Sequence, residues 1–346
     1  VTLAQQDGPA FRDLFLYDDA GDCGDGWTRG IPVHDTVFRS LGSTVTTAIE
    51  EDGPLRVTFR IERQFRLPRR LDPRTKARSN DRVTLDITDF ISLEKHGDAV
   101  RVRTIINNTA EDHRLRVLFP TGCDNDVSFA DTPFAVVERE IPIPESTALW
   151  QERVNEEKAF TSFCGIADAR GGLAVVSPGG LHEYAVLQTP ERELALTLFR
   201  SFRKTVFRPE EPDGQLAGPM EFEYALVPFA GAPDAPRLLH LAAAMQVPVR
   251  FHATAGPVST KSFLSLCRGA AVVTAVKPAE HGQGGIVRFW NPTGKAIDDA
   301  FSTLRPVVSA WYCNLNEEPG TAIEVKDGVV PVRVPAGGIS TVRFTW

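Results

Sequence analysis

Alternation of apolar and polar residues is the clearest pattern in the first two thirds of the chain. Residues 55–62 read Leu-Arg-Val-Thr-Phe-Arg-Ile-Glu, and the same period recurs over 83–87, 100–105 and 115–119. A period of two is typical of strands that bury one face. The pattern therefore predicts β-strands, with a turn at His96-Gly97-Asp98 between the second and third of these runs.

Shorter apolar runs predict further strands over 173–176, 184–187, 194–199 and 222–227. Prolines and glycines, 25 and 27 in number, separate the runs. Their spacing is typical of β-sandwiches rather than of alternating strands and helices. The segment 66–82, which is rich in Arg and Lys and contains two prolines, is predicted to be a solvated loop.

One segment has helical character. Residues 237–246 are rich in Leu and Ala, and they end before Pro248. Beyond them, strand-like runs resume at 272–276, 285–290, 307–311, 330–334 and 340–346. The pattern predicts an all-β protein with a large domain over 1–235, a helical connector over 236–257 and a small β-sandwich over 258–346.

Composition excludes several classes of partner. The chain has 346 residues, 42% of them hydrophobic, and a formal net charge of −7. Nucleic acids and anionic membranes call for a basic face, so neither is an expected partner. The sequence also lacks the run of about 18 apolar residues that spans a bilayer. Five scattered cysteines without a Cys-x-x-Cys pair favour reduced thiols, and hence a cytoplasmic protein.

Known catalytic motifs are absent from the sequence. The seven histidines are isolated from one another, and no His-Glu-x-x-His, Gly-x-Ser-x-Gly or phosphate-binding glycine loop occurs. His96 and Asp98 are formally spaced as a ligand pair, but the glycine between them favours a turn. We therefore assign no catalytic residue and no metal ligand to this chain.

An acidic, glycine-rich cluster lies near the N-terminus. Residues 18–27 read Asp-Asp-Ala-Gly-Asp-Cys-Gly-Asp-Gly-Trp. Carboxylates can accept sugar hydroxyls, and the indole of Trp27 can stack on a pyranose ring. Composition alone favours the alternative, a solvated loop whose Asp side chains cap their own turns.

A second cluster, residues 131–140, reads Asp-Thr-Pro-Phe-Ala-Val-Val-Glu-Arg-Glu. Arg139 stands between two glutamates on an alternating strand. It could form a cross-strand ion-pair ladder, which the pattern alone favours, or present a planar donor fork to a carboxylate or to sugar oxygens.

In their order, these segments resemble the region of glycoside hydrolase family 38 α-mannosidases that follows the catalytic barrel and helical bundle. The resemblance spans nearly the whole chain. It is carried by Gly21-Asp22-Cys23-Gly24-Asp25-Gly26-Trp27, 107–121 with its Asp-His-Arg-Leu-Arg, 131–140, 172–176, Gly180-Leu181-His182-Glu183-Tyr184, 194–201, 221–226 and 287–292.

The resemblance implies a galactose-mutarotase-like supersandwich followed by a smaller β-sandwich. Family members hydrolyse α-mannosides with retention, using an aspartate nucleophile beside a zinc ion held by two His and two Asp on the barrel. None of the barrel motifs occurs here. The resemblance thus implies an inactive part of a mannosidase, with no cofactor of its own and with zinc in the missing barrel. The expected partners are that barrel with its helical bundle, an α-mannoside and a second copy of the chain.

The resemblance also places residues at the substrate rim. Trp27 falls at the position of an aromatic residue that lies near the substrate, although relatives more often carry tyrosine there. Arg139 matches an arginine that approaches the site, while Asp22 and Asp25 shape the turn. Two alternatives remain, a free-standing lectin-like module with Trp27 as its platform and a sugar epimerase, which the sparse histidines disfavour.

Overall fold

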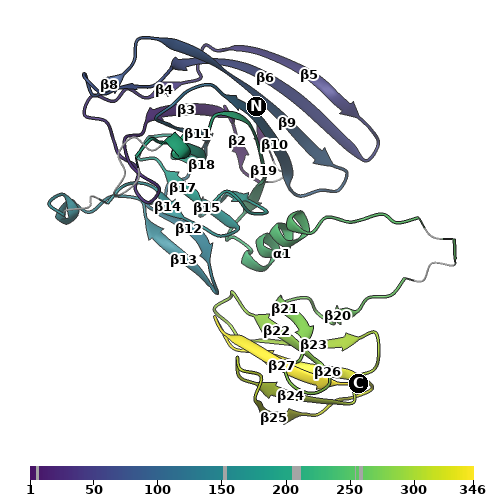
Figure 1. Ribbon diagram of the computed structural model, residues 1–346. Helices are drawn as coiled ribbons and strands as arrows, with labels where there is room; N and C mark the ends of the chain where they lie inside the picture. Colours follow the sequence, from purple (N-terminus) through teal and green to yellow (C-terminus); the bar gives the residue numbers. More distant parts are fainter. Residues whose placement is uncertain (5–7, 151–153, 205–211, 254, 257–259) are drawn as a thin grey trace. The chain divides into compact units, whose positions relative to one another are not determined.

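A computed structural model of the chain describes residues 1–4, 8–150, 154–204, 212–253, 255–256 and 260–346 (Figure 1). The contacts divide it into two units, Val1–Ala130 with Val137–Pro233, and Asp131–Val136 with Asp234–Trp346. Strands dominate both units, and the described ranges contain a single α-helix. The predicted all-β fold class is confirmed.

The first unit is built on two antiparallel sheets. The larger, called the large sheet below, has nine strands in the described residues, in the order β13 (Ala135–Glu140), β12 (Val127–Thr132), β15 (Phe163–Asp168), β16 (Gly171–Val176), β19 (Gly218–Ala230), β10 (Val100–Asn108), β9 (Arg82–Glu94), β6 (Arg56–Pro68) and β5 (Thr44–Asp52). The smaller sheet has the order β14 (Lys158–Ala159), β17 (Glu183–Val186), β18 (Glu193–Ser201), β11 (His113–Pro120), β3 (Leu16–Gly21) and β4 (Phe38–Arg39).

Two short ribbons and two turns of 3₁₀ helix complete this unit. They are β1 (Leu3–Ala4) with β2 (Ala10–Phe11), β7 (Leu71–Asp72) with β8 (Ala77–Arg78), η1 (Glu145–Thr147) and η2 (Pro212–Gly214).

Hydrophobic alternation explains how the long strands pair. β6 and β9 run antiparallel over thirteen residues each, from Arg56 opposite Glu94 to Pro68 opposite Arg82. Facing pairs such as Phe65 and Leu85 turn toward the core, where both are buried. Because side chains alternate between the two faces of a strand, this register places apolar side chains of both strands on the face that packs against the core.

The core of the first unit contains a buried polar group as well as aliphatic and aromatic side chains. Asp89 has no exposed surface, and it accepts hydrogen bonds from Tyr17 Oη at 2.6 Å and Thr104 Oγ1 at 2.7 Å. Arg63 lies 3.5 Å from its other oxygen. Burial raises the pKa of Asp89, and these partners are what make a carboxyl group tolerable in an apolar core.

The predicted solvated loop over 66–82 is wrong in part. Its first residues continue β6, its last begins β9, and β7 and β8 form a ribbon between them. Arg78 is buried, and its guanidinium pairs with Asp19. The arginine is drawn inward because a buried carboxylate on β3 needs a cation.

The predicted helix is confirmed as α1 (Ala235–Gln246). Asp234 caps it by accepting a hydrogen bond from the Arg237 backbone at 3.1 Å, and Pro236 occupies the first turn, where its missing N–H is harmless. No helix in the described ranges is long and apolar enough to cross a bilayer.

Residues 260–346 of the second unit form two facing sheets. The three-stranded one has the order β20 (Leu264–Leu266), β23 (Ile297–Thr303) and β26 (Val329–Val334). The five-stranded one has the order β21 (Val272–Pro278), β22 (Gly285–Trp290), β27 (Ile339–Thr345), β24 (Ser309–Cys313) and β25 (Pro319–Ile323). Phe289, Phe301 and Phe344 are buried against one another in its core.

Candidate functional site

The acidic, glycine-rich segment forms a closed turn after β3. Asp22 Oδ1 accepts hydrogen bonds from the backbone of Gly24 at 2.9 Å and of Gly30 at 3.1 Å. Asp25 Oδ1 accepts from the backbone of Trp27 at 2.9 Å and of Thr28 at 3.0 Å. These two backbone N–H groups lower the pKa of Asp25. Both aspartates therefore fold the segment 22–30, called the rim turn below.

A strand of the smaller sheet holds the rim turn from behind. Arg200 on β18 donates from Nε to Asp22 Oδ2 at 2.7 Å, and from a terminal nitrogen to the Asp25 carbonyl at 2.8 Å. Asp22 is buried, whereas the side chain of Trp27 is 79% exposed. The turn is thus a fixed base that presents one indole to the surroundings.

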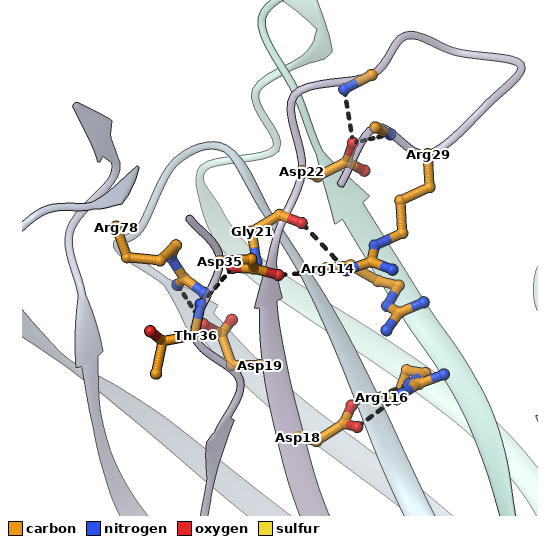
Figure 2. Close-up of polar contacts among 12 residues, drawn as sticks. Asp18, Asp19, Gly21, Asp22, Arg29, Asp35, Thr36, Arg78, Arg114 and Arg116 are labelled. Carbon is orange, nitrogen blue, oxygen red and sulfur yellow. Dashed lines mark hydrogen bonds and ion pairs between the residues drawn. The ribbon is translucent and has the colours of Figure 1, made fainter. Parts of the chain in front are cut away.

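Next to the rim turn, β3 and β11 are neighbouring antiparallel strands with charged side chains (Figure 2). Arg116 makes a two-pronged ion pair with Asp18, from Nε at 2.9 Å and from a terminal nitrogen at 2.7 Å. Arg116 also donates to Glu156. Arg114, almost wholly buried, pairs with Glu157. We call these five residues the charge layer.

Electrostatics in the charge layer are set by burial and by neighbours. Burial lowers the pKa of Arg114 to about 9, with help from the positive charges of Arg116 and Arg29. For Arg116 burial acts in the same direction, but the carboxylates of Asp18 and Glu156 outweigh it and raise the pKa. For Asp18 burial favours the neutral acid, yet Arg116 outweighs it and the pKa is lowered.

His113 occupies the opposite face of β11 and is structural. Its Nδ1 contacts Asp19 Oδ2, and its Nε2 lies 3.1 Å from Asn108 Oδ1. The ring has no exposed surface. Both ring nitrogens therefore have partners, as is typical of a structural core histidine.

Arg139 lies apart from the rim turn in the contacts of the described residues. It is on β13, and a terminal nitrogen donates to the Ala159 carbonyl on β14. It also lies near Tyr184, where it partly offsets the rise in pKa that burial causes. The structure joins Trp27, Asp22 and Asp25 in one turn, whereas Arg139 belongs to a different strand junction.

No three His, Cys, Asp or Glu side chains of the described ranges come together as a metal-binding group. His113 is shared between Asp19 and Asn108, and Asp18 and Asp22 are each neutralised by an arginine. These side chains are thus engaged within the protein, and the family resemblance implies zinc on the barrel rather than on them.

The charge layer was not found from the sequence. Asp18, Arg116 and Glu156 come from three distant segments, so no local motif joins them. A usable signal did exist, because Arg114 and Arg116 on β11 and the Asp18-Asp19 pair on β3 are charged residues inside otherwise apolar strand-like runs.

Comparison with known proteins agrees with this architecture. Residues 5–215 match the glycosyl hydrolases family 38 C-terminal domain, and residues 270–342 match the C-terminal beta sandwich domain of the same family. The chain belongs to glycosyl hydrolase family 38. The resemblance stated from the sequence is confirmed.

Relatives with known structures or curated names are longer proteins. An α-mannosidase from Enterococcus faecalis V583 is 27% identical, with a TM-score of 0.84 over 99% of this chain and 40% of that one. A family 38 protein from Enterococcus faecalis has a TM-score of 0.82 at 27% identity, over 98% and 41%. A putative mannosylglycerate hydrolase of Halalkalibacterium halodurans is 27% identical over 84% of this chain and 34% of its own length. The chain therefore spans well under half of each.

Substitution of Gly24 by alanine tests the rim turn. An added Cβ would lie 2.0 Å from the Thr28 carbonyl oxygen, so the turn must open. We expect Gly24→Ala to destabilise the first unit by about 1–3 kcal/mol in chemical denaturation. Gly26→Ala is the matched control, because its Cβ would meet nothing closer than Phe202 Cζ at 3.7 Å. Equal stability of the two variants would contradict the closed turn.

Acid unfolding of Asp18→Asn tests the charge layer. Loss of the buried carboxylate should cost about 3 kcal/mol at pH 7. The folded pKa of Asp18 lies below its unfolded value, so its contribution is present above about pH 3.9 and is lost as pH falls through the folded pKa. The difference in free energy of unfolding between Asp18→Asn and the wild type should therefore become smaller as the pH falls.

Asp81→Asn is the exposed control for this series. Asp81 pairs with Arg69 at the surface, where its side chain is 63% exposed, so the expected loss is below about 1 kcal/mol. If the difference in free energy of unfolding between Asp18→Asn and the wild type stayed constant from pH 7 to pH 2, Asp18 would not contribute as a buried carboxylate.

Proposed function

We propose that this chain is the non-catalytic C-terminal part of a retaining α-mannoside hydrolase, where it supports the catalytic barrel and forms one wall of the mannoside site. The observation that carries the proposal is the rim turn, which presents the exposed Trp27 from a base fixed by Asp22, Asp25 and Arg200. An indole on a backbone fixed in this way can stack on a pyranose ring.

Exposed apolar residues continue along the chain after the rim turn. The side chains of Ile31, Val33, Val37 and Leu41 are 64%, 69%, 50% and 69% exposed. Several exposed apolar side chains in one short segment are typical of a surface that another domain covers. We assign it to the barrel and helical bundle that the longer relatives have room for.

The side chains of this chain suit a supporting role rather than a catalytic one. Hydrolysis with retention needs a nucleophile and an acid/base carboxylate facing the glycosidic bond. Asp22 and Asp25 accept backbone hydrogen bonds, so we give them a structural role. The nucleophile, the acid/base and the zinc ion are assigned to the barrel, which would supply the Lewis acid. The present chain would orient the sugar and exclude water, and would be inactive by itself.

The relatives' names bear on the substrate. One is an α-mannosidase and another a putative mannosylglycerate hydrolase, so we propose a mannoside with a small or saccharide leaving group. Arg139 is the second rim residue of the proposal. In that role its guanidinium would leave the Ala159 carbonyl, or use its other nitrogens, to reach sugar oxygens.

A free-standing carbohydrate-binding module is the alternative function. A cavity of about 340 Å³ supports it, since Gly26 of the rim turn borders this cavity together with Glu183, Arg200, Phe202 and Phe222. Aromatic faces beside a carboxylate and a guanidinium form a lining that suits a sugar. In this alternative, Trp27 would be the stacking platform of a lectin.

The mass of the native protein separates the two functions. We expect the species purified from its natural source to be much heavier than 38.0 kDa and to cleave an α-mannoside in zinc-containing buffer. The isolated chain should show no turnover. A native species of 38 kDa that binds methyl α-mannoside but does not hydrolyse it would replace the first proposal with the second.

Trp27→Ala in the assembled enzyme tests the rim residue. Loss of the stacking face should reduce kcat/KM for an α-mannoside by about tenfold, which corresponds to about 1.4 kcal/mol. Trp27→Tyr, which keeps an aromatic face, should recover most of the activity. Trp150→Ala is the control for an exposed tryptophan, at 59% exposure. Equal activity of Trp27→Ala and the wild type would remove Trp27 from the substrate wall.

A further inference from the structure

The cavity of about 340 Å³ beside the rim turn lies where one strand of the smaller sheet ends before its neighbour. β17 pairs with β18 as far as Tyr184 opposite Leu196, whereas β18 runs on to Ser201. Residues 197–200 border the cavity in this stretch, and Gly26 of the rim turn borders it as well. Its volume is in the range of about 300–1,000 Å³ that small-molecule sites occupy.

A β-bulge shapes the part of β18 that borders the cavity. The register of β18 against β11 shifts at Leu198, the extra residue between Thr197 and Phe199. A regular strand turns successive side chains to opposite faces, yet all four residues 197–200 border the cavity. Bulges redirect side chains in this way and are frequent beside functional sites.

Two side-chain oxygens of the cavity lining have no hydrogen-bond partner among the described residues. They are Thr197 Oγ1 and Glu183 Oε1. Thr197 is 7% exposed, so its hydroxyl has lost its contacts with bulk water. Buried polar atoms in proteins nearly always have a partner. A ligand with hydroxyl groups would supply partners for both oxygens.

Aromatic rings form much of the remaining lining. Phe199 and Phe222 are stacked, with ring planes 5° apart and ring centroids 6.2 Å apart. The guanidinium of Arg200 lies over the ring of Phe202, 5.3 Å from its centroid. Aromatic surface beside a carboxylate and a hydroxyl suits a ligand that has both an apolar face and hydroxyl donors, and a pyranose has both.

Charge in the cavity favours a neutral ligand. Arg200 is already paired with Asp22 at 2.7 Å. Glu183 has no ion-pair partner within the described ranges, so its charge is not compensated there. A ligand that carries a carboxylate would be repelled by Glu183, whereas a sugar hydroxyl can donate to it.

We propose that this cavity receives a neutral sugar on the leaving-group side of the scissile bond, with hydroxyls bonded to Glu183 and Thr197. The inference rests on the proposed function, and it narrows the leaving group to a saccharide. Gly26 borders the cavity and directly precedes Trp27, so the cavity adjoins the surface on which we place the mannose. The substrate is then a mannoside of at least two sugars.

Replacement of Glu183 in the assembled enzyme tests the assignment. The measured quantity is the ratio of kcat/KM for mannobiose to kcat/KM for p-nitrophenyl α-mannoside, whose leaving group has no hydroxyl to donate to Glu183. We expect Glu183→Ala to lower this ratio at least about tenfold, because a hydrogen bond to a charged group is lost. Glu183→Gln keeps an acceptor oxygen and should recover most of the ratio. Glu191→Ala is the control, since Glu191 is exposed in the turn between β17 and β18.

Thr197→Val separates a ligand contact from a structural role. Valine has the shape of threonine without the hydroxyl, and this hydroxyl has no partner in the described part of the fold. We therefore expect the midpoint of chemical denaturation to stay at the wild-type value while the mannobiose ratio falls about fivefold. A lower midpoint would show that the hydroxyl is bonded within the fold, and would remove Thr197 from the site.

The outcomes distinguish this inference from the proposed function. A wild-type ratio in Glu183→Ala would overturn the inference, whether activity on both substrates is kept or lost equally, and would leave the hydrolase proposal in place. Weaker binding of Glu183→Ala to the catalytic half would also overturn it, because that half would then fill the cavity. An assembled enzyme that cleaves neither substrate would overturn the proposed function, and this assignment with it.

Discussion

The ion pair between Asp18 and Arg116 is the interaction on which the first unit depends. It joins β3 to β11 near the centre of the smaller sheet, and both side chains are almost wholly buried. Two charges can be buried together only when their geometry is good and their remaining hydrogen-bond donors and acceptors have partners. Arg116 meets the second condition through Glu156, which ties the segment after η1 to the sheet.

Further arginine contacts next to the charge layer fix the rim turn at the surface. Arg29 lies 3.5 Å from Asp35 and donates to the Gly21 carbonyl, so both ends of the rim turn are held against the end of β3. Arg200 fixes the turn from β18. The position of Trp27 is thus decided by buried charges rather than by contacts of its own. A rigid base of this kind is what a binding surface needs in order to hold a sugar ring in one orientation.

Two uncovered apolar surfaces belong to the same unit, and they differ in kind. Residues 31–41 follow the rim turn and are irregular apart from β4, so they suit a surface that a folded domain covers. β5 is an edge strand with a β-bulge between Ile49 and Glu51, and its outer side has no partner strand among the described residues. The irregular backbone of the first surface is why we assign it to the catalytic half.

The sequence by itself determined the parts of this protein that depend on local pattern. Alternation predicted β6, β9, β10 and β11, and a Leu- and Ala-rich run that ends before Pro248 predicted α1. The Asp–Gly spacing predicted a turn before Trp27. Each of these is set by residues close together in the chain, where period and turn chemistry act.

Only the tertiary structure decided which charges are buried and where the sheets end. Asp18 and Arg116 are 98 residues apart, and charged residues look solvated until a partner is seen. Arg78 was assigned to a solvated loop for the same reason. β5 has no clear alternation because both its faces are exposed. Burial of a charge depends on a partner far away in the sequence, and whether a strand is an edge strand depends on which strands pair with it. A local sequence pattern therefore predicts neither.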